Sequence, residues 1–201
     1  MSALGLFVFL GAVALFLAAY HYSIRRAFEL PLTGIELHPI HTADGWRIML
    51  YRIRQGDSNG EPVLLCHGFS SNHWNLNVPR GESIADYLAA QGYDCWAIDL
   101  RGTRSSTPPF GTPRHRATFD GYVMEDLPTA IAHIRSVTGH EQVHWVGHSL
   151  GGTLLYAYEL VHGGAQIASG TTIGSPTGLQ PTWPAWQSKL IRTMEVIAGV
   201  Y

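Results

Sequence analysis

The chain has 201 residues, of which 46% are hydrophobic and 11% aromatic, and its formal net charge at pH 7 is −2. This length and composition provide enough apolar side chains for one buried core and exclude a disordered chain. The near-neutral charge, with arginines scattered rather than clustered, excludes a nucleic-acid-binding surface.

The first segment is an uncharged stretch, and residues 3–20 read ALGLFVFLGAVALFLAAY. As a helix it would extend about 27 Å, close to the thickness of the hydrocarbon core of a bilayer. We predict that residues 1–24 form an uncleaved membrane anchor, with a cleaved signal peptide as the alternative. Because Arg25 and Arg26 follow the stretch and no basic residue precedes it, the positive-inside rule predicts a single-pass membrane protein whose C-terminal side lies in the cytoplasm.

The next segment predicts a linker over residues 25–34 and then a β-hairpin. Residues 35–42 and 46–54 both alternate between apolar and polar side chains, and the turn between them contains Gly45. This hairpin begins a core that we expect to cover residues 35–176.

Four apolar runs that lack polar alternation follow, and helical patterns separate them. Such strands need both faces of their sheet covered, which predicts an α/β fold with a mostly parallel sheet and helices on both faces, ending near a sixth strand. The expected strands lie at residues 62–68, 93–100, 142–149 and 167–175, and the expected helices at 82–92, 125–139 and 150–162.

The third of these strands ends in the motif Gly-His-Ser-Leu-Gly, residues 147–151, and a helix follows without a break. A sharp strand-to-helix turn lifts a serine side chain above the sheet, and flanking glycines remove side chains that would collide. We therefore predict that Ser149 is a nucleophile, supported by Gly147 and Gly151. The alternative is a glycine-lined structural turn around a buried serine.

A serine that attacks a carbonyl also needs hydrogen-bond donors for the oxygen that becomes negative. The backbone amides of Leu150 and Phe69 are the expected donors, because both follow the ends of neighbouring strands. Gly68 permits close approach of the backbone, and His67 is expected to fix the loop by hydrogen bonds rather than to transfer protons. His148 is not expected to act as the base.

Residues 62–163 resemble the α/β-hydrolase superfamily, and within it the acid-lipase group related to gastric and lysosomal lipases. The resemblance rests on LLCHGFSSNHWNLN, SIADYLAAQGYDCWAIDLRGTRSS, FDGYVMEDLPTAIAHIRSVTG and VHWVGHSLGGTLLYAY, in this order and spacing. It implies a Ser, Asp, His triad in that order along the chain, with the acid after a seventh strand and the histidine after an eighth.

The sequence holds no candidates for those two partners in the expected place. After Gly174 the one carboxylate side chain is Glu195, and there is no histidine. We therefore expect an N-terminal fragment or truncated reading frame, in which the triad acid and base would lie beyond residue 201. Residues 177–201 are expected to begin the lid segment that this family inserts here, and the helical spacing of Trp186, Leu190 and Met194 fits either an acyl pocket or ordinary core packing.

The predicted function is that of a lipase-like or esterase-like serine hydrolase that cleaves carboxylic esters with an apolar acyl part. Its partners would be a lipid or small-molecule ester and, through the N-terminal helix, a membrane; no metal or organic cofactor is implied. The alternatives are an acyltransferase of the same fold, and a membrane-anchored interaction module without catalysis.

Four further residues are given structural roles. Asp99 is expected to hold a loop by hydrogen bonds, and Asp126 to mark the start of a helix. Cys66 and Cys95 lie in apolar runs and are expected to be buried thiols without a disulfide.

Overall fold

The computed structural model describes residues 3–27, 34–56, 59–78, 82–103 and 105–177. The chain divides into two units, residues 1–33 and residues 34–201. The expected lid segment, apart from its first residue, lies outside the described residues.

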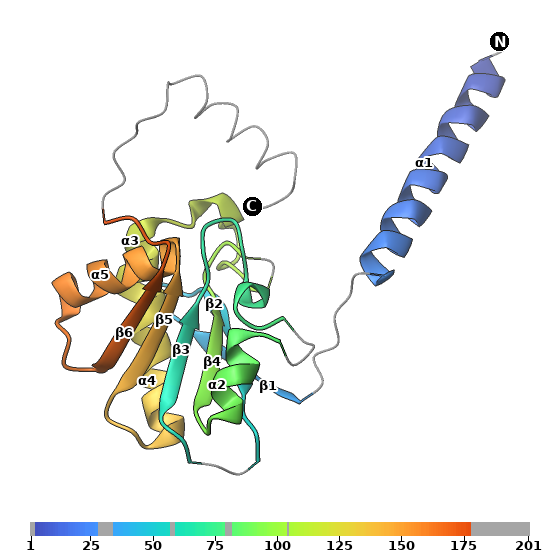
Figure 1. Cartoon of the computed structure of the whole chain (residues 1–201). Helices are drawn as coiled ribbons and strands as arrows, with labels where there is room; N and C mark the ends of the chain where they lie inside the picture. Colours follow the sequence, from blue (N-terminus) through green and yellow to red (C-terminus); the bar gives the residue numbers. More distant parts are fainter. Residues whose placement is uncertain (1–2, 28–33, 57–58, 79–81, 104, 178–201) are drawn as a thin grey trace. The chain divides into compact units, whose positions relative to one another are not determined.

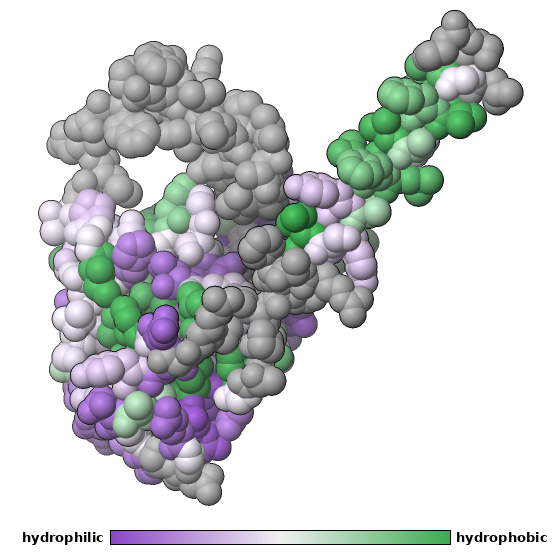
Figure 2. Space-filling view, turned by 45° about the vertical axis from the view of Figure 1, so that its right-hand side comes forward, coloured by the Kyte–Doolittle hydropathy of each residue, from purple (hydrophilic) through white to green (hydrophobic). Residues whose placement is uncertain are grey.

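The first unit contains one helix, α1 (Ala3–Ala27), which extends three residues past the boundary expected at residue 24. Its large apolar side chains are exposed in the isolated chain, and Figure 2 shows a largely apolar surface along the helix. Residues Gly5–Ile24 are long and apolar enough to cross a membrane, although an N-terminal signal sequence meets the same criteria.

The second unit is built on one six-stranded sheet with the order β1-β2-β4-β3-β5-β6. The first two strands form the expected antiparallel hairpin, and β2 is also antiparallel to β4, whereas the pairs β4/β3, β3/β5 and β5/β6 are parallel. The strands are β1 (Ile35–His41), β2 (Arg47–Ile53), β3 (Pro62–Cys66), β4 (Asp94–Asp99), β5 (Val143–His148) and β6 (Ile167–Ile173).

Helices cover both faces of this sheet, as predicted (Figure 1). On one face α2 (Ile84–Ala90) packs against a small cluster that includes Leu65 and Ala97. On the other face α4 (Leu127–Thr138) and α5 (Leu150–His162) enclose the larger cluster. Alternate residues of β2, β3 and β4 supply the two clusters, because successive side chains of a strand point to opposite faces.

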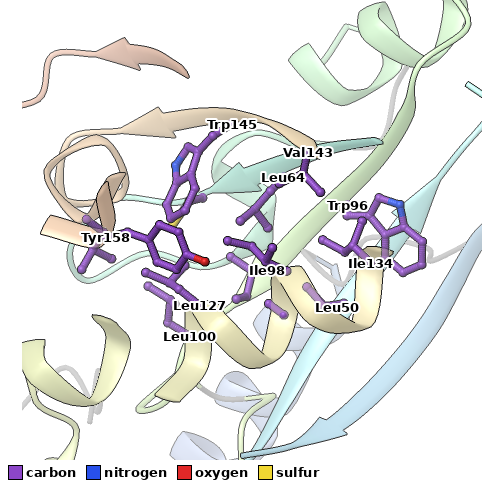
Figure 3. Close-up of a cluster of buried hydrophobic side chains, with 14 of the residues drawn as sticks. Leu50, Leu64, Trp96, Ile98, Leu100, Leu127, Ile134, Val143, Trp145 and Tyr158 are labelled. Atoms are coloured by element: carbon purple, nitrogen blue, oxygen red, sulfur yellow. The ribbon is translucent and has the colours of Figure 1, made fainter. Parts of the chain in front are cut away.

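The larger cluster fixes α4 and α5 against the strands that lead to the site (Figure 3). Trp145 from β5 packs against Tyr158 from α5, with ring centroids 5.9 Å apart. Leu127 and Ile134 of α4 are fully buried in the same cluster. The turn between β5 and α5 is therefore anchored by buried aromatic and aliphatic side chains on both of its sides.

The helix that ends with α4 begins six residues before the expected start at residue 125. It comprises α3 (Phe119–Gly121), a π-helical turn (Tyr122–Asp126) and α4 without interruption. The hydroxyl of Thr118 caps this helix by accepting a hydrogen bond from Gly121 N. At the other end the helix stops at Gly139, whose φ of 76° favours glycine.

The carboxyl ends of β3, β4, β5 and β6 meet at one edge of the sheet, because these strands are parallel. Two short 3₁₀ turns, His73–Asn75 and Arg114–Arg116, lie in the loops that leave β3 and β4. In open α/β sheets this edge is where ligands bind.

Candidate active site

Ser149 joins β5 to α5 in a backbone conformation that side chains rarely adopt. Its φ is 50° and its ψ is −113°, and Ser70 is the one other non-glycine residue in the described part of the chain with a positive φ. The Ser149 N–H donates to the carbonyl of Ile173 at 2.8 Å, which fastens the turn to the end of β6. A strained residue held between a buried strand and a helix is a feature of functional sites.

The glycines on either side of Ser149 have no room for a side chain. A Cβ at Gly147 would overlap the backbone of Gly151, and a Cβ at Gly151 would overlap the carbonyl of Cys66 at the end of β3. Both glycines therefore permit the first turn of α5 to lie directly on the ends of β3 and β5, as expected of a sharp elbow.

The loop that follows β3 lies against this elbow. A Cβ at Gly68 would be 3.0 Å from His148 Nδ1 and 3.3 Å from Ser149 Cβ, so the backbone at Gly68 is close to the serine. Neither the Phe69 amide nor the Leu150 amide has a hydrogen-bond acceptor within the part of the chain that the structure describes. Two backbone donors next to the serine are therefore available to a ligand.

His67 is buried beneath this loop and is used for hydrogen bonds. Its Nδ1 lies 2.7 Å from the carbonyl oxygen of Gly68, and its Nε2 lies 3.4 Å from the backbone N–H of Leu100, which donates to it. Burial lowers the pKa of His67, which favours the neutral ring. These contacts join the loop after β3 to the loop after β4, as expected of a residue that fixes the loop.

Asp99, the last residue of β4, holds the next part of the same loop. Its Oδ1 accepts hydrogen bonds from the backbone N–H of His73 at 2.7 Å and from the His73 ring at 3.1 Å, and its Oδ2 accepts from the Tyr51 hydroxyl at 3.2 Å. Burial opposes the charge of Asp99, but the hydrogen bonds and charge of His73 outweigh it and lower the pKa of this carboxyl. The loop is thus tied to a buried carboxylate.

Asp126 directly precedes α4, but it does not cap the start of a helix as expected. Asp126 lies within the continuous helix, makes no capping bond, and accepts hydrogen bonds from the Arg101 backbone N–H and Arg101 Nε, both at 2.8 Å. Arg101 also donates to Asp44 in the β1/β2 turn at 2.7 Å. Burial raises the pKa of Asp126 to about 6, although Arg101 acts in the opposite direction. The true cap, Thr118, stands eight positions earlier.

The part of the chain that the structure describes brings no base into hydrogen-bond contact with the serine. Among the described residues no side chain makes a hydrogen bond to Ser149 Oγ. The neighbouring His148 is engaged elsewhere, because its Nδ1 lies 2.9 Å from Asn75 Oδ1. No sequence signal distinguishes Asn75, because it is one of three asparagines in six residues and their spacing has no regular pattern.

The match of the sequence to known families agrees with this arrangement. Residues 61–201 match the family described as alpha/beta hydrolase fold. The chain belongs to the α/β-hydrolase family. In this α/β-hydrolase the elbow, the loop after β3 and the sheet edge are therefore parts of one known fold.

Lipases are among the relatives of this α/β-hydrolase. It is 35% identical over 137 residues to triacylglycerol lipase 2 of Arabidopsis thaliana, covering 61% of the chain and 32% of the relative. It is 35% identical over 132 residues to the gastric triacylglycerol lipase of Bos taurus, covering 59% of the chain and 33% of the relative. These matches confirm the resemblance to the acid-lipase group, and the chain spans about a third of the length of these relatives.

Solved structures share the fold at lower identity. An epoxide hydrolase of Vigna radiata matches with a TM-score of 0.56 at 20% identity, over 80% of this chain and 47% of that one. An esterase of a Rhodococcus species matches with a TM-score of 0.54 at 23% identity, over 75% of this chain and 49% of that one. Because the two differ in reaction, these matches establish the architecture of the sheet and not the chemistry.

Neither of the two cysteines of this α/β-hydrolase is exposed for reaction. Cys66 and Cys95 are buried free thiols, as predicted, and burial raises the pKa of both. The described residues contain no group of three or more histidine, cysteine or acidic side chains arranged to hold a metal ion.

Proposed function

We propose that this α/β-hydrolase cleaves carboxylic esters through an acyl-enzyme on Ser149. One observation carries the proposal: Ser149 is held at a positive φ on the strand-to-helix turn, beside a loop backbone whose Phe69 amide, like that of Leu150, has no acceptor among the described residues. A structural turn around an inert serine would need neither the strained backbone at Ser149 nor the two backbone N–H groups without acceptors.

The proposed reaction begins when Ser149 Oγ attacks the carbonyl carbon of the ester and a general base removes its proton. The carbonyl oxygen becomes negative, and the N–H groups of Phe69 and Leu150 donate hydrogen bonds to it. Leu150 is the first residue of α5, so the positive end of the helix dipole also favours the anion. The C–O bond then breaks, the alcohol leaves with the proton, and water releases the acid from the acyl-serine.

The proposed substrate is an ester with an apolar acyl part, in keeping with the triacylglycerol lipases among the relatives. The Phe69 side chain supports this choice, because it is 58% exposed on the loop whose amide would hold the carbonyl oxygen. An exposed aromatic ring next to the reacting carbonyl provides a surface for the acyl chain.

The nucleophile is tested with a fluorophosphonate probe, which labels activated serines. We expect labelling in a preparation that also includes the triad acid and histidine, and its loss in Ser149→Ala. Ser169→Ala is the matched control, since the Ser169 hydroxyl lies 2.8 Å from His144 Nδ1 and is thus near a base but outside the elbow. Absence of labelling in the protein, or labelling that persists in Ser149→Ala, would contradict the proposal.

We also propose that α1 anchors the protein as a single span, with the anchor at residues 1–24, the hydrolase core at 35–176 and the start of a lid at 177–201. Arg25 and Arg26 at the end of the apolar span favour a cytoplasmic position for the core. A reporter fused after Arg26 should therefore be active in the cytoplasm, and a reporter found outside it would reverse this orientation.

A further inference from the structure

Asn75 connects the two backbone segments that would form the oxyanion site. It is the last residue of the short turn His73–Asn75, and its Oδ1 lies 3.2 Å from the Gly68 backbone nitrogen and 2.9 Å from His148 Nδ1. Gly68 precedes Phe69, and His148 precedes Ser149. The Asn75 amide oxygen therefore contacts the residue before the Phe69 amide and the residue before the Ser149 nucleophile.

The chemistry of these contacts shows that Nδ1 of His148 carries a hydrogen. A backbone N–H can only donate, so the Asn75 atom that faces Gly68 must be the oxygen. The same oxygen faces His148 Nδ1 and can only accept, so Nδ1 carries a hydrogen. In the neutral ring this leaves Nε2 without a proton.

Asn75 is itself held in place by the buried end of β4. The turn that contains it begins at His73, and the His73 backbone and ring both donate to Asp99. The Asn75 N–H donates to the carbonyl of Asn72 at 2.9 Å. The amide oxygen is therefore presented from an anchored turn and not from a free loop.

We propose that Asn75 is a positioning residue that locks the loop carrying the Phe69 amide against the Ser149 elbow and holds His148 in its Nδ1–H form. This role rests on the proposed function. The lock matters because a donor stabilises the transition state only when it already points to where the negative charge develops. Removing it frees the loop without altering Ser149 or the donors.

The first test measures the tautomer of His148 by ¹⁵N NMR of the full chain in detergent micelles, labelled on histidine and assigned by the signal lost in His148→Gln. We expect a protonated Nδ1 in the wild-type chain and in Asn75→Asp, which retains an acceptor oxygen. In Asn75→Leu, which is similar in size but apolar, we expect loss of this preference and faster hydrogen exchange at the Gly68 amide. A protonated Nε2 and bare Nδ1 in the wild-type chain would overturn the proposal.

The second test compares hydrolysis of a p-nitrophenyl ester by the wild-type protein and by Asn75→Leu, both in a preparation that also includes the triad acid and histidine. Freeing the loop should weaken the hydrogen bond from the Phe69 amide to the transition state, which we expect to lower kcat about tenfold with little change in KM. The matched control is Gln142→Leu, which also replaces a side-chain amide by leucine. Gln142 Nε2 donates to the Ala165 carbonyl at 3.0 Å, outside the loop and the elbow. This control should lower thermal stability but retain kcat.

The outcomes separate this proposal from the proposed function. A wild-type protein that neither hydrolyses the ester nor reacts with a fluorophosphonate contradicts the proposed function, and the positioning role fails with it. An active wild-type protein whose Asn75→Leu variant keeps its kcat, or changes KM alone, overturns the role of Asn75 and leaves the proposed function intact. Equal losses in Asn75→Leu and Gln142→Leu would show a general loss of folded protein and would also overturn the role.

Discussion

At the scale of single residues, the site depends on backbone strain at Ser149. A side chain at a φ of 50° is unfavourable, whereas glycine adopts this conformation readily. We therefore predict that Ser149→Gly has a free energy of unfolding about 1 kcal/mol higher than that of Ser149→Ala, although both lack the nucleophile. Urea unfolding of the two variants measures this difference, and equal stabilities would indicate that the turn is not strained.

Asp99 makes the stability of the chain depend on pH. Its carboxyl has a pKa below the ordinary value of 3.8, so the unfolded chain binds the proton more readily than the folded chain. The contribution of Asp99 to stability is therefore complete above that ordinary value and is lost as the pH falls through the folded pKa.

Asp99→Asn should for this reason flatten the acid side of the stability profile. As the pH falls below about 4 we expect the wild-type chain to lose stability more steeply than the variant, as measured by urea unfolding at a series of pH values. The variant should be less stable at pH 7, where the charged hydrogen bonds to His73 are complete. Parallel profiles would contradict the assigned role of Asp99.

At the scale of elements, the strands and helices were predictable because each carries its own pattern. The hairpin alternates, β3 and β4 are buried throughout, and α5 occupies the expected range of residues 150–162. The early start of the helix before α4 was missed, because the π-helical turn depends on packing and on Arg101, which is distant in sequence. For the same reason the contacts of Asn75 had no local signal.

Arg101 joins three elements, and we predict a large loss of stability in Arg101→Met. This variant leaves Asp126, which is fully buried, without its charged partner and detaches Asp44 in the hairpin turn. Breaking a buried pair by removing one member costs about 3–5 kcal/mol.

The double variant Arg101→Met/Asp126→Leu should recover much of this loss, because it removes the uncompensated charge as well. Urea unfolding of the single and double variants provides the comparison. A single variant within about 1 kcal/mol of the wild type would show that Asp126 is readily neutralised or hydrated, and would contradict the prediction.

At the scale of the whole molecule, the parallel order of the strands explains why separate motifs meet. The chain visits β3, β4, β5 and β6 with a helix after each of the first three, so each strand returns to the same edge. The loop of His67 and Gly68, the carboxyl of Asp99 and the elbow of Ser149 are therefore neighbours although they span about 80 residues. The sequence predicted this placement, since βαβ connections allow little else.

The remaining prediction concerns the unit formed by α1. If Gly5–Ile24 is an anchor, the protein recovered from cells retains its N-terminus by mass and stays with membranes after alkaline carbonate extraction. An arginine near the centre of a span costs about 3 kcal/mol, which corresponds to a partition change of about 100-fold, so Leu15→Arg should release the protein from the membrane.

The matched control is Leu160→Arg, a similar change at an exposed position of α5, and this variant should stay membrane-bound. A wild-type protein recovered without residues 1–24 would instead identify the helix as a signal peptide, and a membrane-bound Leu15→Arg variant would place the attachment in the hydrolase unit.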